Sequence, residues 1–331
     1  MSDKKYKAAV IGCGGIGAEE WNYSKGVQPG THAAAYKNNF KVNLAALVDI
    51  NQKKLKRAGQ YFPEVPLFSS AKKMFEKIKP DIVSIATNSG SHASLVKMAA
   101  KHKTSAILCE KPIAESIKEA EEMIKICEKN KSLLFINHQR RFDPLLQQWR
   151  SEIKKGIIGK IVQVNCYYYN GLFNSGTHMI DLLRFFLGDI NWVRGIINEQ
   201  TSWKENDKNI DALVGFKSGT VAAMQTLPKN YGFSEFYFYG TKGYFAIKNL
   251  GYEIECRKLI ENKYCKGFYQ LSENIKKEGK ARSLMSSVVS HIVSCLDGRA
   301  KPVSRGEDGL AVLKALFALK KSAGKNKIIK L

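Results

Sequence analysis

The feature that most constrains how this 331-residue chain can fold is an apolar strand followed at once by a run of glycines. Residues 8–17 read Ala-Ala-Val-Ile-Gly-Cys-Gly-Gly-Ile-Gly, which has the three-glycine spacing that opens dinucleotide-binding units. The first glycine allows a tight turn, the second lets the backbone approach a pyrophosphate, and the third permits close packing. N–H groups at the start of the following helix then bind the phosphates. The residues that this pattern assigns to a cofactor are Gly12, Gly14, Gly15, Ile16 and Gly17.

Short apolar runs alternate with helical patterns through the first 140 residues. The runs are residues 8–11, 44–48, 82–86, 106–109 and 133–136. Between them, segments such as 91–101 and 117–129 repeat apolar residues every three or four positions, which is typical of amphipathic helices. This alternation predicts a parallel sheet with right-handed helical crossovers, and therefore a doubly wound α/β Rossmann domain. We place this NAD(P)-binding domain at residues 1–138.

The pattern changes after Pro144 to longer alternating or aromatic runs, which predict antiparallel strands. The runs are residues 160–170, 212–227, 235–247 and 252–259. Turn residues suited to hairpins stand at 217–220 and 240–243. Helical spacing predicts helices at 177–187 and about 307–322. We assign residues 139–331 to a second, α+β domain with a mostly antiparallel sheet, which we expect to bind substrate.

The composition suits a protein with two apolar cores. Hydrophobic residues make up 44% of the chain, and no apolar run is long enough to span a membrane. The first seven residues, Met-Ser-Asp-Lys-Lys-Tyr-Lys, lead into the first strand without the pattern of a secretory signal. We therefore expect a cytoplasmic protein with no membrane partner.

The seven cysteines are scattered and never spaced as Cys-x-x-Cys, so the sequence predicts reduced thiols and no metal site. Cys109, beside Glu110, is a conceivable nucleophile because a charged neighbour follows it. Its place in an apolar strand favours an inert, buried thiol instead.

The formal net charge of +23 bears on the partners of the chain. A charge of this size attracts phosphates, carboxylated substrates or nucleic acid. The lysines are spread over many segments and no nucleic-acid recognition motif accompanies them, so we expect no nucleic-acid partner. We favour general solubility together with attraction of an anionic substrate.

An acidic residue for the cofactor ribose is expected at the end of the second strand, and Asp49 directly follows the run 44–48. Its carboxylate would repel a 2′-phosphate, so NAD is favoured over NADP. Lys53, Lys54 and Arg57 are nevertheless near enough in sequence to offer a phosphate some compensation. An ordinary helix-capping aspartate is the alternative.

The distance between the glycines and Asp49 is unusual. Asp49 follows Gly17 by 32 positions, whereas the usual gap is about 20 residues. The excess predicts an insertion, and residues 19–30 are aromatic, glycine-containing and poorly periodic. We assign them to a loop near the cofactor, which either covers substrate or only lengthens the connection.

Five short motifs in the chain resemble those of a known family. They are Gly-Cys-Gly-Gly-Ile-Gly at 12–17, Asp-Ile-Val-Ser-Ile-Ala-Thr-Asn at 81–88 with His92, Glu-Lys-Pro at 110–112, Arg-Arg-Phe-Asp-Pro at 140–144, and Gly-Thr-His-Met-Ile-Asp at 176–181. Together they resemble the glucose-fructose oxidoreductase and inositol dehydrogenase family, Gfo/Idh/MocA. The resemblance extends over nearly the whole chain.

The resemblance implies a Rossmann domain followed by a domain with an open antiparallel sheet. That sheet commonly serves as an oligomer interface, so a homodimer or homotetramer is expected. The resemblance also implies a cis peptide bond between Lys111 and Pro112, with Lys111 directed at the nicotinamide ribose and the substrate hydroxyl. The further residues that it places near the cofactor are Thr87, Asn88, His92 and Glu110. A histidine at a helix start can also be a simple surface residue, which is the alternative for His92.

Oxidation of an alcohol needs a base for the hydroxyl proton, and His178 is the leading candidate. Lys111 could stabilise the developing alkoxide or relay the proton. Asn174 and Asp181 lie four residues before and three after His178, so a continuous helix would place them on the same face. The family commonly has aspartate where this chain has Asn174, which can orient an imidazole but cannot stabilise its cation. Asp181 either compensates for the missing aspartate through a charge-assisted contact with His178, or anchors the helix by pairing with a cation such as Arg184.

The strand before this helix supplies candidate substrate contacts. Tyr167 and Tyr169 should point to one side of it, and tyrosines suit the faces of sugars. Arg141 and Lys160 could anchor an anionic group, with salt bridging as the alternative. The predicted substrate contacts are therefore Arg141, Tyr167, Tyr169, Asn174 and His178.

These observations together predict an NAD-dependent oxidoreductase that acts on a secondary hydroxyl of a sugar, cyclitol or nucleotide-linked sugar. The positive charge mildly favours a phosphorylated or nucleotide-linked substrate. The alternative is a catalytically impaired NAD-binding sensor or assembly subunit, which Asn174 suggests. The retained Lys111 and His178 argue against that alternative.

Overall fold

The structure is a computed structural model that describes residues 5–19, 28–232, 234–273, 275–280 and 282–331. The predicted loop at 19–30 therefore falls largely outside the described residues. The chain forms two compact units. Unit 1 comprises Met1–Pro144 and Arg282–Leu313, and unit 2 comprises Leu145–Ala281 and Lys314–Leu331. Unit 1 thus includes residues 282–313, which lie beyond the contiguous domain expected from the sequence.

Unit 1 is built on a parallel sheet of six strands in the order β3-β2-β1-β4-β5-β6. The strands are β1 (Tyr6–Ile11), β2 (Val42–Val48), β3 (Leu67–Phe68), β4 (Ile82–Ile85), β5 (Ala106–Cys109) and β6 (Leu133–Ile136). The central strands are almost wholly apolar and buried, as expected when helices cover both faces. The predicted Rossmann domain is confirmed. β3 was not predicted because two residues give no periodic pattern.

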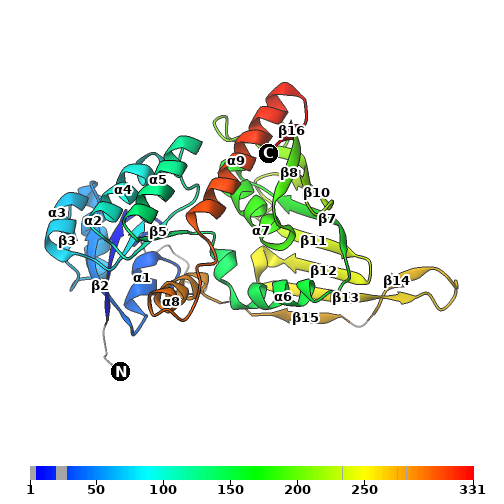
Figure 1. Cartoon of the computed structure of the whole chain (residues 1–331), viewed down its shortest axis with the longest axis horizontal. Coiled ribbons are helices and arrows are strands. Elements are labelled where there is room, and N and C mark those ends of the chain that lie inside the picture. The colour runs from blue at the N-terminus through cyan, green and yellow to red at the C-terminus, as the bar shows by residue number, and fades with distance from the viewer. Residues whose placement is uncertain (1–4, 20–27, 233, 274, 281) are drawn as a thin grey trace. The chain divides into compact units, whose positions relative to one another are not determined.

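Helices cover both faces of this sheet. They are α1 (His32–Lys37), α2 (Gln52–Tyr61), α3 (Ala71–Ile78), α4 (His92–Lys101), α5 (Ile117–Lys129) and α8 (Leu284–Leu296). Figure 1 shows α4 beside α5 and, across the sheet, α1 beside α8. Although α8 is distant in sequence, its Val288 and Ile292 are buried in the same apolar cluster as Tyr36 of α1. This shared burial explains why residues 282–313 belong to unit 1.

Unit 2 is built on a ten-stranded mixed sheet in the order β14-β13-β12-β11-β7-β10-β9-β8-β16, with β15 paired to β13. The strands are β7 (Ile161–Tyr168), β8 (Ile190–Ile197), β9 (Ile210–Phe216), β10 (Val221–Thr226), β11 (Glu235–Gly240), β12 (Gly243–Lys248), β13 (Glu253–Glu261), β14 (Tyr269–Leu271), β15 (Lys276–Gly279) and β16 (Ile329–Lys330). β7 and β10 are parallel, and the other pairs are antiparallel. The predicted mostly antiparallel sheet and both hairpins are confirmed, since residues 217–220 join β9 to β10 and residues 240–243 join β11 to β12.

The two faces of this sheet differ in their covering. On one face, Trp149 of α6 (Pro144–Lys154) packs against Phe245, and Phe186 of α7 (Thr177–Leu187) packs against Phe238, each pair with ring centroids 5.2 Å apart. The opposite face, which we call the outer face, presents side chains that alternate with these buried ones. Exposed apolar residues on it are Ile196, Leu213 and Tyr239. The sheet therefore has one face in the core and one face accessible within the unit.

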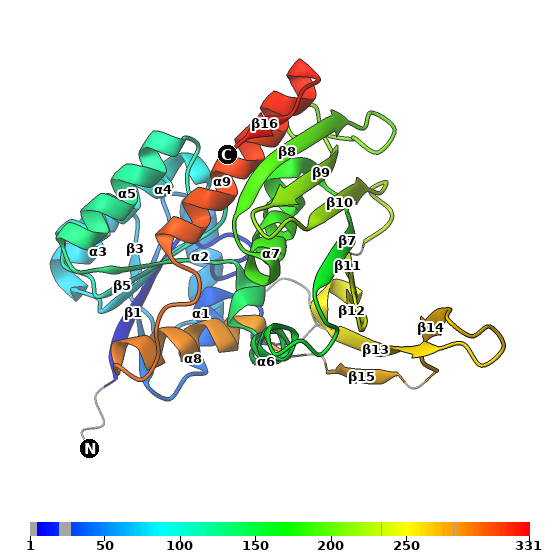
Figure 2. The same ribbon diagram turned by 45° about the vertical axis from the view of Figure 1, so that its right-hand side comes forward.

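α7 matches the predicted helix at 177–187, and the last helix, α9 (Gly306–Lys325), covers the predicted 307–322. Figure 2 shows the ribbon formed by the ends of β13 and β14 projecting beyond the neighbouring strands. Within the described residues, no helix combines the length and the apolar composition that a membrane crossing requires.

Candidate active site

A cavity of about 760 Å³ lies at the carboxyl ends of β1, β2 and β4 in unit 1. This is the edge at which doubly wound sheets bind their ligands. The predicted cofactor residues that line it are Gly12, Gly14, Gly15, Ile16, Asp49, Thr87 and Asn88. The motifs did not single out other lining residues, among them Asn51, Ser91 and Ser94. The fold thus brings most of the predicted cofactor residues to one cavity.

Gly12 and Gly17 occupy positions that no side chain can share. Gly12 has a φ of +100°, and a Cβ there would lie 2.5 Å from the carbonyl oxygen of Ala86. A Cβ on Gly17 would lie 1.9 Å from the carbonyl oxygen of Gly12. Both distances are well below van der Waals contact, so the turn itself requires glycine at these two positions. The absence of side chains at Gly12 and Gly17 therefore lets the backbone of the turn pack closely on itself and on the segment after β4.

The turn after β1 is hydrogen-bonded directly to α1. The N–H of His32 donates to the carbonyl of Ile16 at 3.0 Å, and the N–H of Ala33 donates to that of Gly17 at 2.9 Å. Each bond joins residues sixteen apart, where a regular α-helix joins residues four apart, so twelve residues are inserted. Without them, Asp49 would follow Gly17 by about the usual 20 positions. The predicted insertion is therefore located between the turn and α1.

Asp49 both organises the backbone and lines the cavity. Its Oδ2 accepts a hydrogen bond from the N–H of Cys13, and its Oδ1 accepts one from the N–H of Asn51, each at 2.8 Å. These bonds fix the carboxylate at the wall of the cavity. A carboxylate held at the end of the second strand is the group that hydrogen-bonds ribose hydroxyls in NAD sites.

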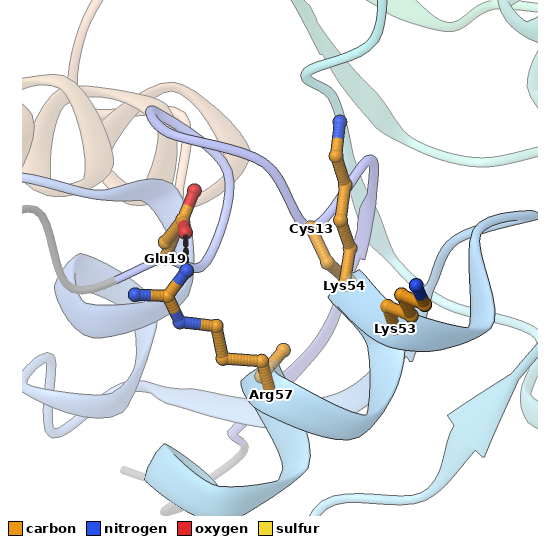
Figure 3. Close-up of a pocket in the computed structure, with 6 residues that line it drawn as sticks. Cys13, Glu19, Lys53, Lys54 and Arg57 are labelled. Carbon is orange, nitrogen blue, oxygen red and sulfur yellow. Dashed lines mark hydrogen bonds and ion pairs between the residues drawn. The ribbon is translucent and has the colours of Figure 1, made fainter.

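A second cavity of about 200 Å³ lies between the glycine turn and α2 (Figure 3). Arg57 of α2 turns toward Glu19 and forms an ion pair with it, whereas Lys54 extends away from that pair. The Nζ of Lys54 lies 3.5 Å from the position that a Cβ would take on Gly14. Lys54 lines the larger cavity as well. It therefore places a positive charge beside the turn that would hold phosphates.

Lys111 follows β5, and its peptide bond to Pro112 is cis, as the family resemblance predicts. Glu110, just before it, is only 9% exposed. Its Oε1 accepts hydrogen bonds from His32 Nε2 at 2.9 Å and Asn137 Nδ2 at 2.5 Å. Its Oε2 accepts one from the N–H of Lys111 at 3.3 Å. The predicted cofactor contact of Glu110 is therefore corrected, because its carboxylate is turned inward and holds the backbone of Lys111.

The charge state of Glu110 follows from these contacts. Burial by itself would raise the pKa of this carboxyl, but the hydrogen bonds from His32 and Asn137 outweigh that effect. The pKa of Glu110 consequently lies below its ordinary value. The carboxylate is ionised at neutral pH and keeps its capacity to accept hydrogen bonds.

His92 is a buried residue that connects two segments of backbone. It is 1% exposed, and its Nδ1 lies 3.0 Å from the carbonyl oxygen of Pro112. Its Nε2 lies 3.1 Å from the carbonyl oxygen of Thr87. Both the predicted cofactor contact and the surface alternative are therefore corrected, because the start of α4 directs this ring inward. His92 instead links the segment of Thr87 to the segment of Lys111.

In unit 2, His178 lies in the first turn of α7, which follows a π-helical turn, η3 (Gly171–Gly176). Asn174 lies in η3, so the helical path does extend backward from His178 as expected, with a wider turn than an α-helix has. Asp181, one turn further on, is 1% exposed. The cation suggested as its partner, Arg184, forms an ion pair with Asp189 at 3.0 Å. π-helical turns occur frequently at functional sites.

Asp207 supports this turn and was not identified from the sequence. Its Oδ1 accepts a hydrogen bond from the N–H of Phe173 at 2.9 Å, and its Oδ2 accepts one from the N–H of Asn174 at 3.1 Å. Backbone N–H groups at the start of a helical segment commonly bond to a side-chain cap, and Asp207 has that role here. It lies more than 30 positions from Asn174 in a loop without periodicity, and only the fold brings the two together.

Two family models match the chain. One, described as an oxidoreductase family with an NAD-binding Rossmann fold, matches residues 6–138, and the other, the GFO/IDH/MocA C-terminal domain, matches residues 146–246. The protein belongs to the Gfo/Idh/MocA family. The resemblance found from its five motifs is thereby confirmed.

Known proteins similar to this Gfo/Idh/MocA oxidoreductase include D-apiose dehydrogenase of Rhizobium rhizogenes, which is 29% identical over 57% of this chain. That alignment spans only 56% of the relative's length. Myo-inositol 2-dehydrogenase of Thermotoga maritima is 23% identical over 98% of both chains. The solved structure of the WlbA dehydrogenase of Bordetella pertussis, in complex with NADH and UDP-GlcNAcA, matches with a TM-score of 0.78 and 20% identity over 99% of both chains. This likeness shows a shared fold.

In this Gfo/Idh/MocA protein, Arg141 is committed to an internal ion pair. It lies in a short 3-10 helix, η2 (Gln139–Phe142), and is 6% exposed. One guanidinium nitrogen lies 2.9 Å from Oδ1 of Asp308 and 3.4 Å from the carbonyl oxygen of Val303. The predicted role of Arg141 as a substrate anchor is therefore corrected, because its charge is already paired within unit 1.

Tyr167 lies on the outer face of the sheet. Its ring centroid is 6.0 Å from that of Tyr237, whereas the next residue, Tyr168, is buried beside Gly176 at the end of η3. Because neighbouring side chains in a strand point to opposite faces, Tyr167 faces away from the helix that carries His178. The predicted substrate contact of Tyr167 is thereby corrected. Tyr169 lies beyond the last residue of β7, outside this alternation.

Cys109 of this Gfo/Idh/MocA protein has the properties of an inert thiol. It is 0% exposed, and burial, together with the charge of Glu110, raises its pKa well above the ordinary value. A thiol that is protonated and inaccessible cannot act as a nucleophile. The favoured interpretation of Cys109 from the sequence is therefore confirmed.

Proposed function

We propose that this protein is an NAD-dependent dehydrogenase or reductase acting on a secondary hydroxyl of a sugar, cyclitol or nucleotide-linked sugar. The observation that carries the proposal is the 760 Å³ cavity in which the glycine turn and Asp49 meet, in a chain of an NAD-binding oxidoreductase family. NAD bound there would accept the hydride that leaves the carbinol carbon. The similarity to D-apiose, myo-inositol and UDP-sugar dehydrogenases supports the carbohydrate class.

The residues of the cavity fit NAD. The backbone at Gly12 and Gly14 is open to a pyrophosphate, and the ammonium of Lys54 adds attraction for it. Asp49 offers carboxylate oxygens to the ribose hydroxyls. The same charge would repel a phosphate on the ribose, so we infer that NAD is preferred over NADP. Thr87 and Asn88 line the opposite side of the turn and would contact the nicotinamide half.

We assign the removal of the hydroxyl proton to His178. Hydride departure from the carbon requires that the oxygen lose its proton, and a neutral imidazole is a suitable base near neutral pH. Asn174, on the preceding turn of the same helical path, would orient the ring by a hydrogen bond, and Asp181 would add negative charge near it. Lys111 would stabilise the developing negative charge on the oxygen.

The substrate is inferred from chemistry and charge. Tyr169 follows β7 and would present an aromatic surface to a sugar ring. The net charge of +23 favours an anionic substrate, which a phosphorylated or nucleotide-linked sugar would satisfy.

We also propose that the outer face of unit 2 joins copies of this chain into a dimer or tetramer. Ile196 is 60% exposed, Leu213 is 45% exposed and Tyr239 is 39% exposed on this face. Exposed apolar side chains gathered on one face commonly mark an interface, and symmetric homodimers are the commonest assembly. Light scattering after size exclusion would measure the mass, and a monomer at micromolar concentration would exclude the proposal.

The function is tested by following nicotinamide absorbance while NAD is offered with free sugars, cyclitols, sugar acids and nucleotide-linked sugars. His178→Ala protein, checked for NAD binding, is the control. Turnover with one of these classes, and its loss in the control, is the expected result. If NAD binds but no class reacts in either direction, the proposed reaction is excluded for these substrates.

A further inference from the structure

His32 lies within a series of buried polar side chains that the roles above do not use. Its Nε2 lies 2.9 Å from Oε1 of Glu110, and its Nδ1 lies 2.9 Å from Oγ of Ser84. That Ser84 oxygen lies 2.7 Å from the hydroxyl of Tyr36. His32, Ser84 and Tyr36 are each 0% exposed, and all of these residues belong to unit 1. Such a series is costly to bury unless every group is satisfied.

One arrangement of hydrogens satisfies the whole series. Tyr36 donates to Ser84, Ser84 donates to Nδ1 of His32, and Nε2–H of His32 donates to the carboxylate of Glu110. Burial raises the pKa of Tyr36, so its hydroxyl keeps the proton that this arrangement requires. A serine, a histidine and a carboxylate in sequence also occur in hydrolases, but a serine with no exposure cannot meet a substrate. Each hydrogen bond in the series is therefore donated toward Glu110, whose carboxylate only accepts.

The backbone of His32 provides a second connection. Its N–H donates to the carbonyl of Ile16, which belongs to the glycine turn that lines the cofactor cavity. Glu110, at the other end, accepts the N–H of Lys111. A single residue thus contacts the turn that would hold the phosphates and, through one carboxylate, the segment that carries Lys111.

We propose that His32 is a positioning residue that fixes the Lys111 segment relative to the glycine turn. By donating to one oxygen of Glu110, the imidazole keeps the other oxygen directed at the N–H of Lys111. Without that donor, the buried carboxylate would turn toward Asn137 or take up a proton, and either change would loosen its hold on Lys111. The inference rests on the proposed function only for the catalytic consequence.

The test compares three variants in the full chain. His32→Leu fills the space but removes the donor, and His32→Gln retains an N–H donor. Tyr6→Phe removes a hydrogen bond to Asp297 elsewhere in unit 1 and controls for the loss of a bond as such. Amide hydrogen exchange at Lys111, followed by NMR or fragment-resolved mass spectrometry, reports the bond from Glu110 directly. Turnover, the KM for NAD and the thermal midpoint are measured alongside.

His32→Leu should speed exchange at the Lys111 amide and lower kcat by on the order of 10-fold to 100-fold, the cost of a small misplacement of a reacting group. The KM for NAD should change little, because the backbone bond to Ile16 does not depend on the side chain. His32→Gln should show slower exchange at the Lys111 amide and a higher kcat than His32→Leu. Tyr6→Phe should leave exchange at Lys111 and kcat unchanged.

Unchanged exchange at Lys111 in folded His32→Leu would overturn the proposal, whether or not the wild type turns over. Faster exchange with unchanged kcat would overturn the positioning role. If the wild type reacts with no carbohydrate, the proposed function fails and the exchange result still decides the role of His32. Should His32→Leu not fold, Glu110→Gln is the second variant, and it must also speed exchange at Lys111 for the proposal to stand.

Discussion

Asp49 accepts a hydrogen bond from the N–H of Cys13 at 2.8 Å, so the acid at the end of β2 and the glycine turn at the end of β1 are held together. The same carboxylate lines the cofactor cavity. Its hydrogen bonds to the backbone and its proposed selection of the cofactor can be separated, because asparagine keeps an acceptor oxygen and loses the charge.

Asp49→Asn and Asp49→Ser should both raise the ratio of kcat/KM with NADP to kcat/KM with NAD by about tenfold, or ~1.4 kcal/mol, because the repulsion of a 2′-phosphate is lost. Asp49→Ser should be the less stable of the two, since it cannot reach the N–H of Cys13 with the same geometry. Steady-state kinetics with both cofactors and thermal unfolding provide the measurements. A ratio that stays at the wild-type value would show that Asp49 does not face the ribose.

Lys54→Gln should raise the KM for NAD, because it removes a positive charge beside the glycine turn. The increase should be only about threefold to tenfold, because Lys54 is exposed to solvent. Lys56→Gln is the matched control, since Lys56 is exposed on the same helix and lines neither cavity. The difference between the two variants should shrink at high salt, where exposed charges are screened. Equal KM values for both variants would argue against a phosphate contact by Lys54.

The sequence could predict that the glycine turn, Asp49 and the residues after β4 meet at one cavity, because the determinants of that arrangement are local. The glycines, Asp49 and the residues after β4 each follow a buried strand, and parallel strands bring their carboxyl ends to one edge. The gap of 32 residues also carried information, since it predicted an insertion that the hydrogen bonds of His32 and Ala33 now locate.

The errors arose where the partner of a side chain is distant in sequence. Arg141 is paired with Asp308, and Glu110 with His32, and neither pairing leaves a periodic or motif signal. Tyr167 was assigned to the wrong face because the position of α7 over the sheet decides which member of the tyrosine run points inward. The placement of α8 in unit 1 likewise depends on burial against α1.

Lys111→Ala and His178→Ala should each retain NAD binding and lose turnover, by roughly 100-fold to 10,000-fold for the proposed base His178. NAD binding is measured by fluorescence and turnover by nicotinamide absorbance. Lys118→Ala, a lysine of α5 outside the residues that line the cavity, is the control for loss of one positive charge. Wild-type turnover in both Lys111→Ala and His178→Ala would remove the catalytic assignment.

Asp207→Ala should lower the free energy of unfolding by about 1 kcal/mol, because it leaves the N–H groups of Phe173 and Asn174 without their cap. It should also lower kcat, since the turn that carries Asn174 precedes His178. Asp207→Asn retains one acceptor oxygen and should lie between Asp207→Ala and the wild type in both measurements. Chemical denaturation and steady-state kinetics test the prediction, and an unchanged free energy in Asp207→Ala would contradict it.

Asp297 makes the stability of unit 1 depend on pH in the acid range. Asp297 accepts hydrogen bonds from Lys41 Nζ at 2.9 Å, Tyr6 hydroxyl at 2.8 Å and an Arg299 nitrogen at 2.6 Å, and these contacts hold its pKa well below the ordinary value. Because the folded pKa is lower than that of an unfolded aspartate, about 3.9, the stabilisation is complete above that value. It is lost as the pH falls below about 4 toward the folded pKa.

Asp297→Asn should therefore be less stable than the wild type at pH 7, and the difference in thermal midpoint should narrow as the pH falls from about 4 to 3. Asp189→Asn is the control, because the Asp189 side chain is 61% exposed in its ion pair and should show little difference at either pH. A difference for Asp297→Asn that is as large at pH 3 as at pH 7 would contradict the lowered pKa. The hydrogen bonds of Asp297 would then stabilise unit 1 to the same extent whether or not its carboxyl group is ionised.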